Sequence, residues 1–188
     1  MRFALLAAVA ALMLSSCDSG GVPSPAEKLG GKGEEAPVAA NAVALRPDGL
    51  TAGAESFYFA AGKAEVEAAL AKALGAALRS GENPECGAGP ITFTDYAGGL
   101  TAHFQEGRLV GWNLHLPQDG DRAASGTIAV AGTVQLGSAR GVVEGAPGFA
   151  KVEGSTLGEE FALGDKLGGF ITGDRVEMLY AGTRCFFR

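Results

Sequence analysis

The segment Leu100–Leu116, LTAHFQEGRLVGWNLHL, decides the fold of this chain, because apolar and polar residues alternate along most of it. Alternation with a period of two is typical of a β-strand with one buried face. A three-residue loop, Gln105–Gly107, would pair Phe104 with Arg108 and place the whole apolar set on one face. A two-residue loop at Glu106–Gly107 would split that set between two faces. Burial therefore predicts an antiparallel hairpin with the three-residue loop.

A second hairpin is predicted near the C-terminal end of the sequence. A tight turn at Gly173–Asp174 would pair Ile171 with Val176, and both turn residues suit a two-residue loop. A further turn at Ala181–Gly182 would direct Cys185 toward the core. These strands are expected to form an antiparallel meander.

One helix is predicted between Gly62 and Gly75. Its apolar residues recur at helical spacing and would form a single buried face: Val66, Leu70, Ala73 and Leu74. Gly62 suits the position before the first turn, and Gly75 suits the position after the last turn. A strand at Ile128–Leu136 and a shorter helix capped by Ser138 are expected farther along the chain.

Two parts of the sequence follow the same order of elements, which suggests an internal repeat covering residues 50–116 and 126–188. Each part has a strand, a helix that begins after a glycine, and a hairpin that begins at a glycine pair. These glycines are Gly62 and Gly98–Gly99 in one part, and Gly137 and Gly168–Gly169 in the other. The predicted fold class is α+β, an antiparallel sheet with one or two helices on one face, as a tandem β-α-β-β-β repeat. Chance similarity is the alternative, because the chain contains 30 glycines.

The N-terminal residues carry the features of an export signal. Arg2 supplies a positive charge, an apolar run follows, and Leu14-Ser15-Ser16-Cys17 ends it. This run is shorter than the roughly 20 residues of a transmembrane helix. The order is similar to the signal peptide (residues 1–16) and lipobox of bacterial lipoproteins. That resemblance implies that Cys17 receives a diacylglycerol and then an acyl chain such as palmitate; a secreted protein with an unmodified cysteine is the alternative.

Residues 17–48 are predicted to be the lipidated cysteine followed by a flexible tether. The stretch is rich in Gly, Pro, Ala, Ser and charge, and it has no apolar periodicity. The folded α+β domain is expected to comprise residues 49–188. On this interpretation the chain is anchored in a membrane of the bacterial envelope and faces the periplasm, and the choice between inner and outer membrane stays open.

Two further cysteines follow the lipobox, Cys86 and Cys185. In an oxidising periplasm two such cysteines most often pair, which predicts a structural disulfide. The pair lacks the C-x-x-C spacing of a redox-active site. A metal site would need more ligands than two cysteines offer. Free thiols are the remaining alternative.

The two histidines, His103 and His115, are the residues that a metal or acid–base site would need. In the predicted register they lie about 20 Å apart, too far to share a zinc ion. The sequence also lacks a complete nucleophile motif or phosphate-binding loop. We therefore expect no catalytic, cofactor-binding or metal-binding residues. The net charge of −6 and the absence of a Lys/Arg run disfavour a nucleic-acid partner.

Four short segments carry a resemblance to a known family: Glu85–Pro90, Gly99–Thr101, Gly111–Trp112 and Ala181–Cys185. They resemble segments of small, uncharacterised envelope lipoproteins of sphingomonad-type alphaproteobacteria. Some members of that family are labelled aspartate-semialdehyde dehydrogenase, a label that this sequence does not support because it lacks G-x-G-x-x-G after a strand. More distantly, the doubled helix-and-sheet unit is similar in topology to the β-lactamase-inhibitor-protein and outer-membrane assembly lipoprotein fold.

These observations favour a non-enzymatic function. The first hypothesis is a lipid-anchored protein-interaction module of the cell envelope, with a protein partner that meets the face or edge of the sheet. The alternative is a periplasmic domain that holds a small molecule or a lipid between sheet and helix. An enzyme is the weakest hypothesis, because no catalytic constellation is found in the sequence.

Overall fold

The computed structural model describes residues 39–118, 121–183 and 185. The predicted signal peptide (1–16) and the predicted lipidation site, Cys17, lie outside these residues. The strands are β1 (Ala42–Arg46), β2 (Gly49–Ala52), β3 (Glu55–Tyr58), β4 (Arg79–Asn83), β5 (Ile91–Tyr96), β6 (Leu100–Gln105), β7 (Arg108–His115), β8 (Thr127–Val130), β9 (Phe149–Lys151), β10 (Glu159–Leu163), β11 (Leu167–Thr172) and β12 (Arg175–Gly182). The helices are α2 (Lys63–Leu74) and α3 (Arg140–Glu144).

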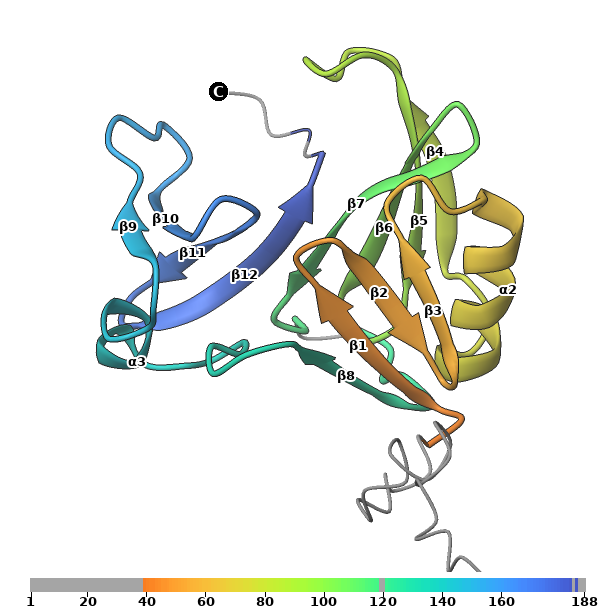
Figure 1. Cartoon of the computed structure of the whole chain (residues 1–188), viewed down its shortest axis with the longest axis horizontal. Helices are drawn as coiled ribbons and strands as arrows, with labels where there is room; N and C mark the ends of the chain where they lie inside the picture. Colours follow the sequence, from red (N-terminus) through yellow and green to blue (C-terminus); the bar gives the residue numbers. More distant parts are fainter. Residues whose placement is uncertain (1–38, 119–120, 184, 186–188) are drawn as a thin grey trace, which may run out of the picture. The chain divides into compact units, whose positions relative to one another are not determined.

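The strands form two sheets (Figure 1). The larger sheet has eight strands in the order β4-β5-β6-β7-β12-β11-β10-β9. All of its neighbours are antiparallel, and the pairing of β7 with β12 joins a meander of β4–β7 to a meander of β9–β12. The smaller sheet has the order β3-β2-β1-β8, with β8 parallel to β1. The predicted α+β class with an antiparallel sheet is therefore confirmed.

Helix α2 covers part of the core, as its spacing predicted. Gly62 and Gly75 flank it, and its buried residues are Val66, Ala69, Leu70, Ala73 and Leu74. The helix contacts strands of both sheets, β1 and β2 of the smaller one and β5 and β7 of the larger one. Trp112 of β7 connects the sheets as well, because its indole N–H donates to the carbonyl oxygens of Arg46 (2.9 Å) and Gly49 (3.1 Å).

The loop between β6 and β7 differs from the prediction. Gln105 pairs directly with Arg108, so the turn has two residues, Glu106 and Gly107, and not three. Both turn residues have positive φ, 50° and 73°. This is the backbone of a type I′ turn, whose twist matches that of the strands it joins.

A β-bulge explains how the two-residue turn still keeps the apolar residues together. Phe104 pairs with Leu109, whereas His103 pairs with Gly111, so Val110 is the extra residue. The shift returns the following residues of β7 to the buried face, where Trp112 is 1% exposed. One inserted residue reverses the facing of the strand beyond it. The two-residue turn therefore does not divide the apolar residues between the two faces of the hairpin, contrary to the expectation from the sequence.

The C-terminal hairpin is partly as predicted. The turn at Gly173–Asp174 does pair Ile171 with Val176, and a bulge follows it, because Phe170 pairs with Met178. The second turn, predicted at Ala181–Gly182, is wrong. Strand β12 runs through both residues because it pairs with β7, a strand distant in sequence.

Three local predictions about the repeat also need correction. The pair Gly168–Gly169 lies inside β11 and does not begin a hairpin. The predicted strand at Ile128–Leu136 is real but shorter, as β8. The short helix α3 exists, yet its N-cap is Ala139; the Ser138 hydroxyl instead accepts from the backbone N–H of Gln135 (2.9 Å).

The folded part begins earlier than the predicted boundary between residues 48 and 49. Strand β1 lies within the expected tether and alternates buried with half-buried residues. Val43 and Leu45 are 1% and 0% exposed. The two apolar side chains are surrounded by alanines, so their alternation is too short to stand out in the sequence.

The predicted disulfide is present between Cys86 and Cys185, with 5.1 Å between the two Cα atoms. It joins the loop between β4 and β5 to the residues that follow β12. None of the helices in the described part of the chain has the length and apolar character needed to span a bilayer.

Candidate functional site

The eight-stranded sheet has two chemically different faces. One face packs on the core and carries residues such as Ala102, Phe104, Trp112 and Leu179. The opposite face carries the alternate residues of the same strands, and we call it the polar face. Both helices contribute buried residues to the core cluster, Leu70 from α2 and Val143 from α3.

One row of directly paired residues crosses all eight strands on the polar face. In sheet order it consists of Arg79, Asp95, Thr101, Asn113, Tyr180, Gly168, Ala162 and Ala150. The residues on β4–β7 are polar or charged, and those from β12 to β9 are a tyrosine followed by glycine and alanines. The row therefore changes from charged to small and apolar across the junction of β7 with β12.

The charged end of the row is held by hydrogen bonds. Arg79 donates through two nitrogens to one carboxylate oxygen of Asp95 (2.9 and 2.7 Å), and the Thr101 hydroxyl donates to the other (2.8 Å). The Arg79 guanidinium also lies 5.1 Å from the centroid of the Phe93 ring. These contacts fix the positions of a cation and an anion side by side on adjacent strands.

His103 lies next to this group and is half-buried. Its Nε2 lies 2.6 Å from the amide oxygen of Asn113, and its Nδ1 is buried without a hydrogen-bond partner among the described residues. Burial lowers the pKa of His103, an effect that the bond to Asn113 and the charge of Asp95 oppose. The imidazole is therefore held in its neutral form at neutral pH, with Nε2 as the donor to the amide oxygen.

The half of the polar face formed by β9–β12 contains a buried glutamate. The Tyr180 hydroxyl donates a hydrogen bond to Glu160 Oε1 (2.6 Å), and Glu160 is 1% exposed. The Tyr180 ring lies 5.8 Å from the Phe170 ring. A Cβ on Gly168 would lie only 2.4 Å from the tyrosine oxygen, so glycine is the residue that lets this ring lie flat on the sheet.

Two concave regions adjoin this half of the face. A groove of about 240 Å³ is lined chiefly by apolar side chains, with Leu157, Phe170 and Met178 among them. A larger cavity of about 610 Å³ lies nearer the disulfide, and Phe59, Ala88, Tyr180 and Thr183 contribute to its wall. Leu157 is 40% exposed at the edge of this groove.

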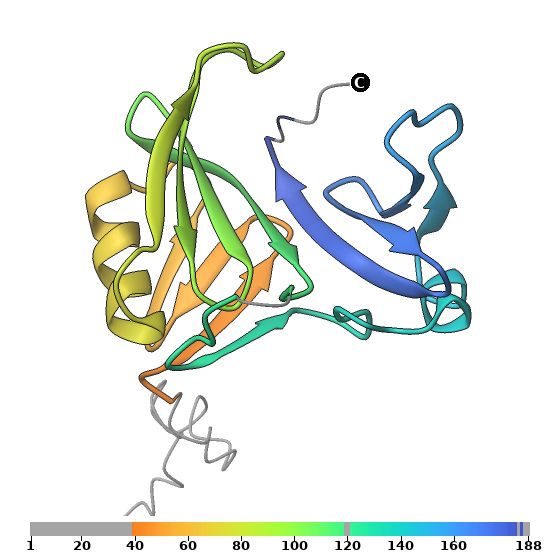
Figure 2. The ribbon, with the colours of Figure 1, turned by 180° about the vertical axis from the view of Figure 1, so that it is seen from behind.

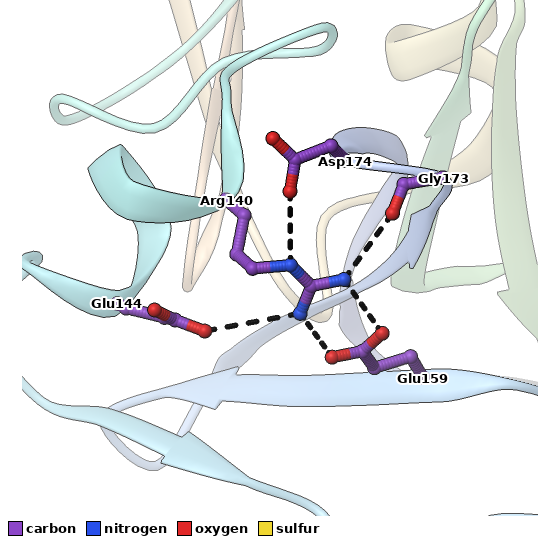
Figure 3. Close-up of polar contacts among 5 residues, drawn as sticks. All are labelled: Arg140, Glu144, Glu159, Gly173 and Asp174. Atoms are coloured by element: carbon purple, nitrogen blue, oxygen red, sulfur yellow. Dashed lines mark hydrogen bonds and ion pairs between the residues drawn. The ribbon is translucent and has the colours of Figure 1, made fainter.

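Arg140 forms a separate cluster at the start of α3 (Figure 3). Its guanidinium forms a bidentate ion pair with the carboxylate of Glu159 on β10. Its Nε also donates to Asp174 (3.0 Å) in the turn before β12. Glu144, one helical turn later, lies 3.8 Å away. The guanidinium lowers the pKa of Glu159. One cation thus fastens the helix to two elements of the sheet.

The contacts at the start of α3 match those at the start of α2. Lys63 is the first residue of α2 as Arg140 is of α3, and each forms an i,i+4 ion pair, with Glu67 and Glu144. In each case the backbone N–H of this first residue donates to a carbonyl in a two-residue turn. Lys63 donates to Gly107 in the turn before β7, and Arg140 donates to Asp174 in the turn before β12. The third residue after each, Val66 or Val143, is 0% exposed.

The chain preceding each helix repeats the match. Ala60 and Gly137 have positive φ (80° and 75°), and each donates its N–H to the strand that follows a two-residue turn, at Leu109 or Val176. Those two residues donate in return to Ala61 and Ser138. Isolated bridges join Gly62 to Arg108 and Ala139 to Arg175. Two stretches of chain therefore form the same frame of hydrogen bonds.

The structure places the sequence-predicted residues as follows. His103 and His115 both lie on the polar face but stay apart: His103 is opposite Gly111, so about 14 Å separates them, less than the 20 Å expected. Among the described residues no group of three or more His, Cys, Asp or Glu could hold a metal ion. Cys86 and Cys185 are together, as predicted.

Sequence reasoning missed Arg140, Glu160 and Tyr180. Glu159 and Glu160 are neighbours in β10 and point to opposite faces of the sheet, where the first meets Arg140 and the second meets Tyr180. What the sequence did not reveal is the partner of each, because both partners come from elements distant in the chain. No protein-family model, no curated protein and no solved structure matches this chain.

Proposed function

We propose that this chain is a lipid-anchored protein of the bacterial cell envelope that binds another protein on its polar face and performs no chemistry of its own. The observation that carries the proposal is the cross-strand row from Arg79 to Ala150, with its change from charged to apolar side chains. Arginine is among the residues that most often dominate binding energy at protein interfaces, and the side chain of Arg79 is 70% exposed.

The fixed geometry of the polar face supports binding over catalysis. The side chains of Asp95, Thr101 and Arg79 are already bonded to one another. Such a surface is pre-organised, so a partner would not have to pay the entropy of ordering it. The groove at Leu157, Phe170 and Met178 offers a place for an apolar anchor of the partner beside this polar region.

The matched frames at α2 and α3 support a tandem repeat. The element order β3-α2-β4-β5-β6-β7 is followed by β8-α3-β9-β10-β11-β12, so each unit has one strand more than the predicted β-α-β-β-β order. We place the two copies within the expected ranges 50–116 and 126–188. The matching hydrogen bonds, bridges and bulges at corresponding positions favour a repeat over chance similarity between glycine-rich segments. Doubling the unit and joining β7 to β12 would create a face twice as wide as one copy provides.

The proposed location rests on the N-terminal sequence. The order Leu14-Ser15-Ser16-Cys17 after an apolar run is the basis for lipidation at Cys17. The disulfide between Cys86 and Cys185 is consistent with an oxidising compartment such as the periplasm. The lipid would hold the chain at the membrane, where its partner is expected.

Capture of partners in the cell tests the proposal. The native chain and the variant Met178→Glu are crosslinked in the cell, and co-purifying proteins are identified by mass spectrometry. The expected result is one envelope protein that is enriched with the native chain and lost with Met178→Glu. Val142→Glu is the matched control, because Val142 is an exposed apolar residue on α3. Equal enrichment with both variants, each of native melting temperature, would contradict binding at the polar face.

A small-molecule or lipid ligand is the second candidate function, and the cavity of about 610 Å³ favours it. This volume lies in the range of ordinary ligand sites. Phe59 and Tyr180 supply aromatic surface, and Lys166 supplies a charge at the wall. Native mass spectrometry of the purified chain distinguishes this function from the first, because a retained ligand would add a discrete mass that solvent extraction removes.

A further inference from the structure

Strand β8 is an edge strand that differs from the other sheet edges. The edges at β3, β4 and β9 carry charged residues: Glu55, Arg79 with Glu82, and Lys151. Thr127–Ala131, which comprises β8 and the next residue, carries no charge and no proline. Charges and prolines are the usual protection of a sheet edge against pairing with another chain. In Figures 1 and 2, no described strand runs along the outer side of β8.

The backbone of β8 alternates between groups that bind β1 and groups that face outward. Thr127 and Ala131 donate their N–H groups to Asn41 and Leu45, on the β1 side. In a parallel ladder the residues between them point the other way. Ile128 and Val130 therefore direct both their N–H and their C=O groups toward the open edge.

The side chain of Gln135 occupies half of that edge. The Val130 N–H donates to Gln135 Oε1 (3.0 Å), and Gln135 Nε2 donates to the Val130 carbonyl (2.6 Å). A primary amide thus makes the pair of bonds that one residue of an added antiparallel strand would make. The same Nε2 also donates to the Gly132 carbonyl (3.0 Å), so the side chain is held in place. The outward N–H and C=O groups of Val130 are therefore able to form hydrogen bonds with an amide at the open edge.

We infer that the edge of β8 pairs with the β8 edge of a second copy of this chain, and that Gln135 competes with this pairing. The strand is self-complementary. With a two-fold axis at Ala129, Ile128 faces Val130 of the second copy, and both residues use the groups that already point outward. The arrangement forms four backbone hydrogen bonds, places two β-branched side chains opposite each other, and brings no like charges together.

The side chains at the proposed axis permit the close approach. Thr127, Ala129 and Ala131 are exposed. Ala129 is small enough for the close approach of a non-hydrogen-bonded antiparallel pair, in which the two Cα atoms are about 4.5 Å apart. Because the Gln135 amide must leave before the second strand binds, the native chain forms this dimer weakly. Removal of the amide strengthens the dimer.

Register-specific disulfide formation tests the inference. The full chain carrying Ala129→Cys is purified, treated with a mild oxidant and analysed on a non-reducing gel. Cysteines at the axis would come within disulfide range of each other. In Thr127→Cys, the matched control on the same exposed side of the strand, the two cysteines would lie about 13 Å apart. The unsubstituted chain gives the background from its own cysteines.

The expected result is several-fold more covalent dimer for Ala129→Cys than for Thr127→Cys, with a further increase when Gln135→Ala is added. The double variant Thr127→Cys/Ala131→Cys should regain the crosslink, since these positions face each other across the axis. Equal crosslinking at positions 127 and 129 would overturn the proposed register. A wholly monomeric Ala129→Cys/Gln135→Ala chain with a native melting temperature would overturn the pairing itself.

Discussion

Arg108 and Arg175 make the same bond in two places 67 residues apart in the chain. Each begins a strand after a two-residue turn, and each donates from its guanidinium to a backbone carbonyl in the segment that leads into a helix. Arg108 bonds to Ala60 (3.3 Å) and Arg175 bonds to Gly137 (3.0 Å). The bond belongs to the frame of contacts that α2 and α3 share, although α2 has twelve residues and α3 only five.

The shared frame predicts that one buried valine in each helix contributes equally to the free energy of unfolding. Val66→Ala and Val143→Ala each remove two buried methyl groups from a fully buried position. Each should lower the free energy of unfolding by about 2 kcal/mol. Denaturant unfolding measures both, and Val142→Ala, at the exposed neighbouring position, is the control. A negligible effect of Val143→Ala would show that the short helix α3 does not contribute to the core as α2 does.

The disulfide should contribute strongly to stability, because it closes a loop with a sequence separation of 99 residues. In the chain-entropy model such a crosslink contributes at most about 4–5 kcal/mol. Cys185→Ser should therefore lower the melting temperature under oxidising conditions, and a reductant should lower that of the native chain to a similar value. Cys86→Ser should have the same melting temperature as Cys185→Ser, because each variant breaks the same bond. A melt of Cys185→Ser that equals the native one would contradict this role.

The stability of the chain should decrease below the ordinary pKa of histidine. Burial lowers the pKa of His103 from 6.5, so the folded state binds its proton less readily than the unfolded state. The contribution is then fully present above pH 6.5 and is lost as the pH falls toward the folded-state pKa. Denaturant unfolding between pH 5 and 8 measures it, with His103→Gln as the comparison. His115→Gln, which alters the other histidine, should retain the native pH dependence.

The ion pair between Arg140 and Glu159 predicts a second, more acidic dependence. Arg140 lowers the pKa of Glu159 from 4.5 in the folded state. The pair therefore stabilises the fold above pH 4.5 and loses its effect as the pH falls through the folded-state pKa. Thermal melts of the native chain and Glu159→Gln should converge toward acidic pH. Arg140→Lys keeps the charge but loses the two-pronged geometry, so it should fall between the two.

The sequence was sufficient to predict those elements whose signal is local. The spacing of Val66, Leu70 and Leu74 predicts α2, and the glycines beside it predict its ends. The turn at Gly173–Asp174 was predicted from its own two residues. The pairing of Cys86 with Cys185 followed from compartment and count. Each of these depends on neighbouring residues or on a chemistry with few partners.

The errors have a common physical cause. The hairpin at residues 105–107 was assigned without a bulge, because Leu109 and Val110 are both apolar and either can occupy the buried face. The second turn at 181–182 was predicted because the pairing of β12 with β7 is long-range and has no local signal. The contacts of Arg140 and Tyr180 were missed for the same reason.

Photo-crosslinking from the polar face tests the central claim most directly. A photo-reactive amino acid is placed at Met178 in the lipidated chain in its native membrane, and the same residue is placed at Glu65, on α2, as the control. If another protein binds this face, Met178 should give a crosslink to one envelope protein and Glu65 should give none. A crosslink of equal yield from both positions, or lipid alone at Met178, would contradict the account.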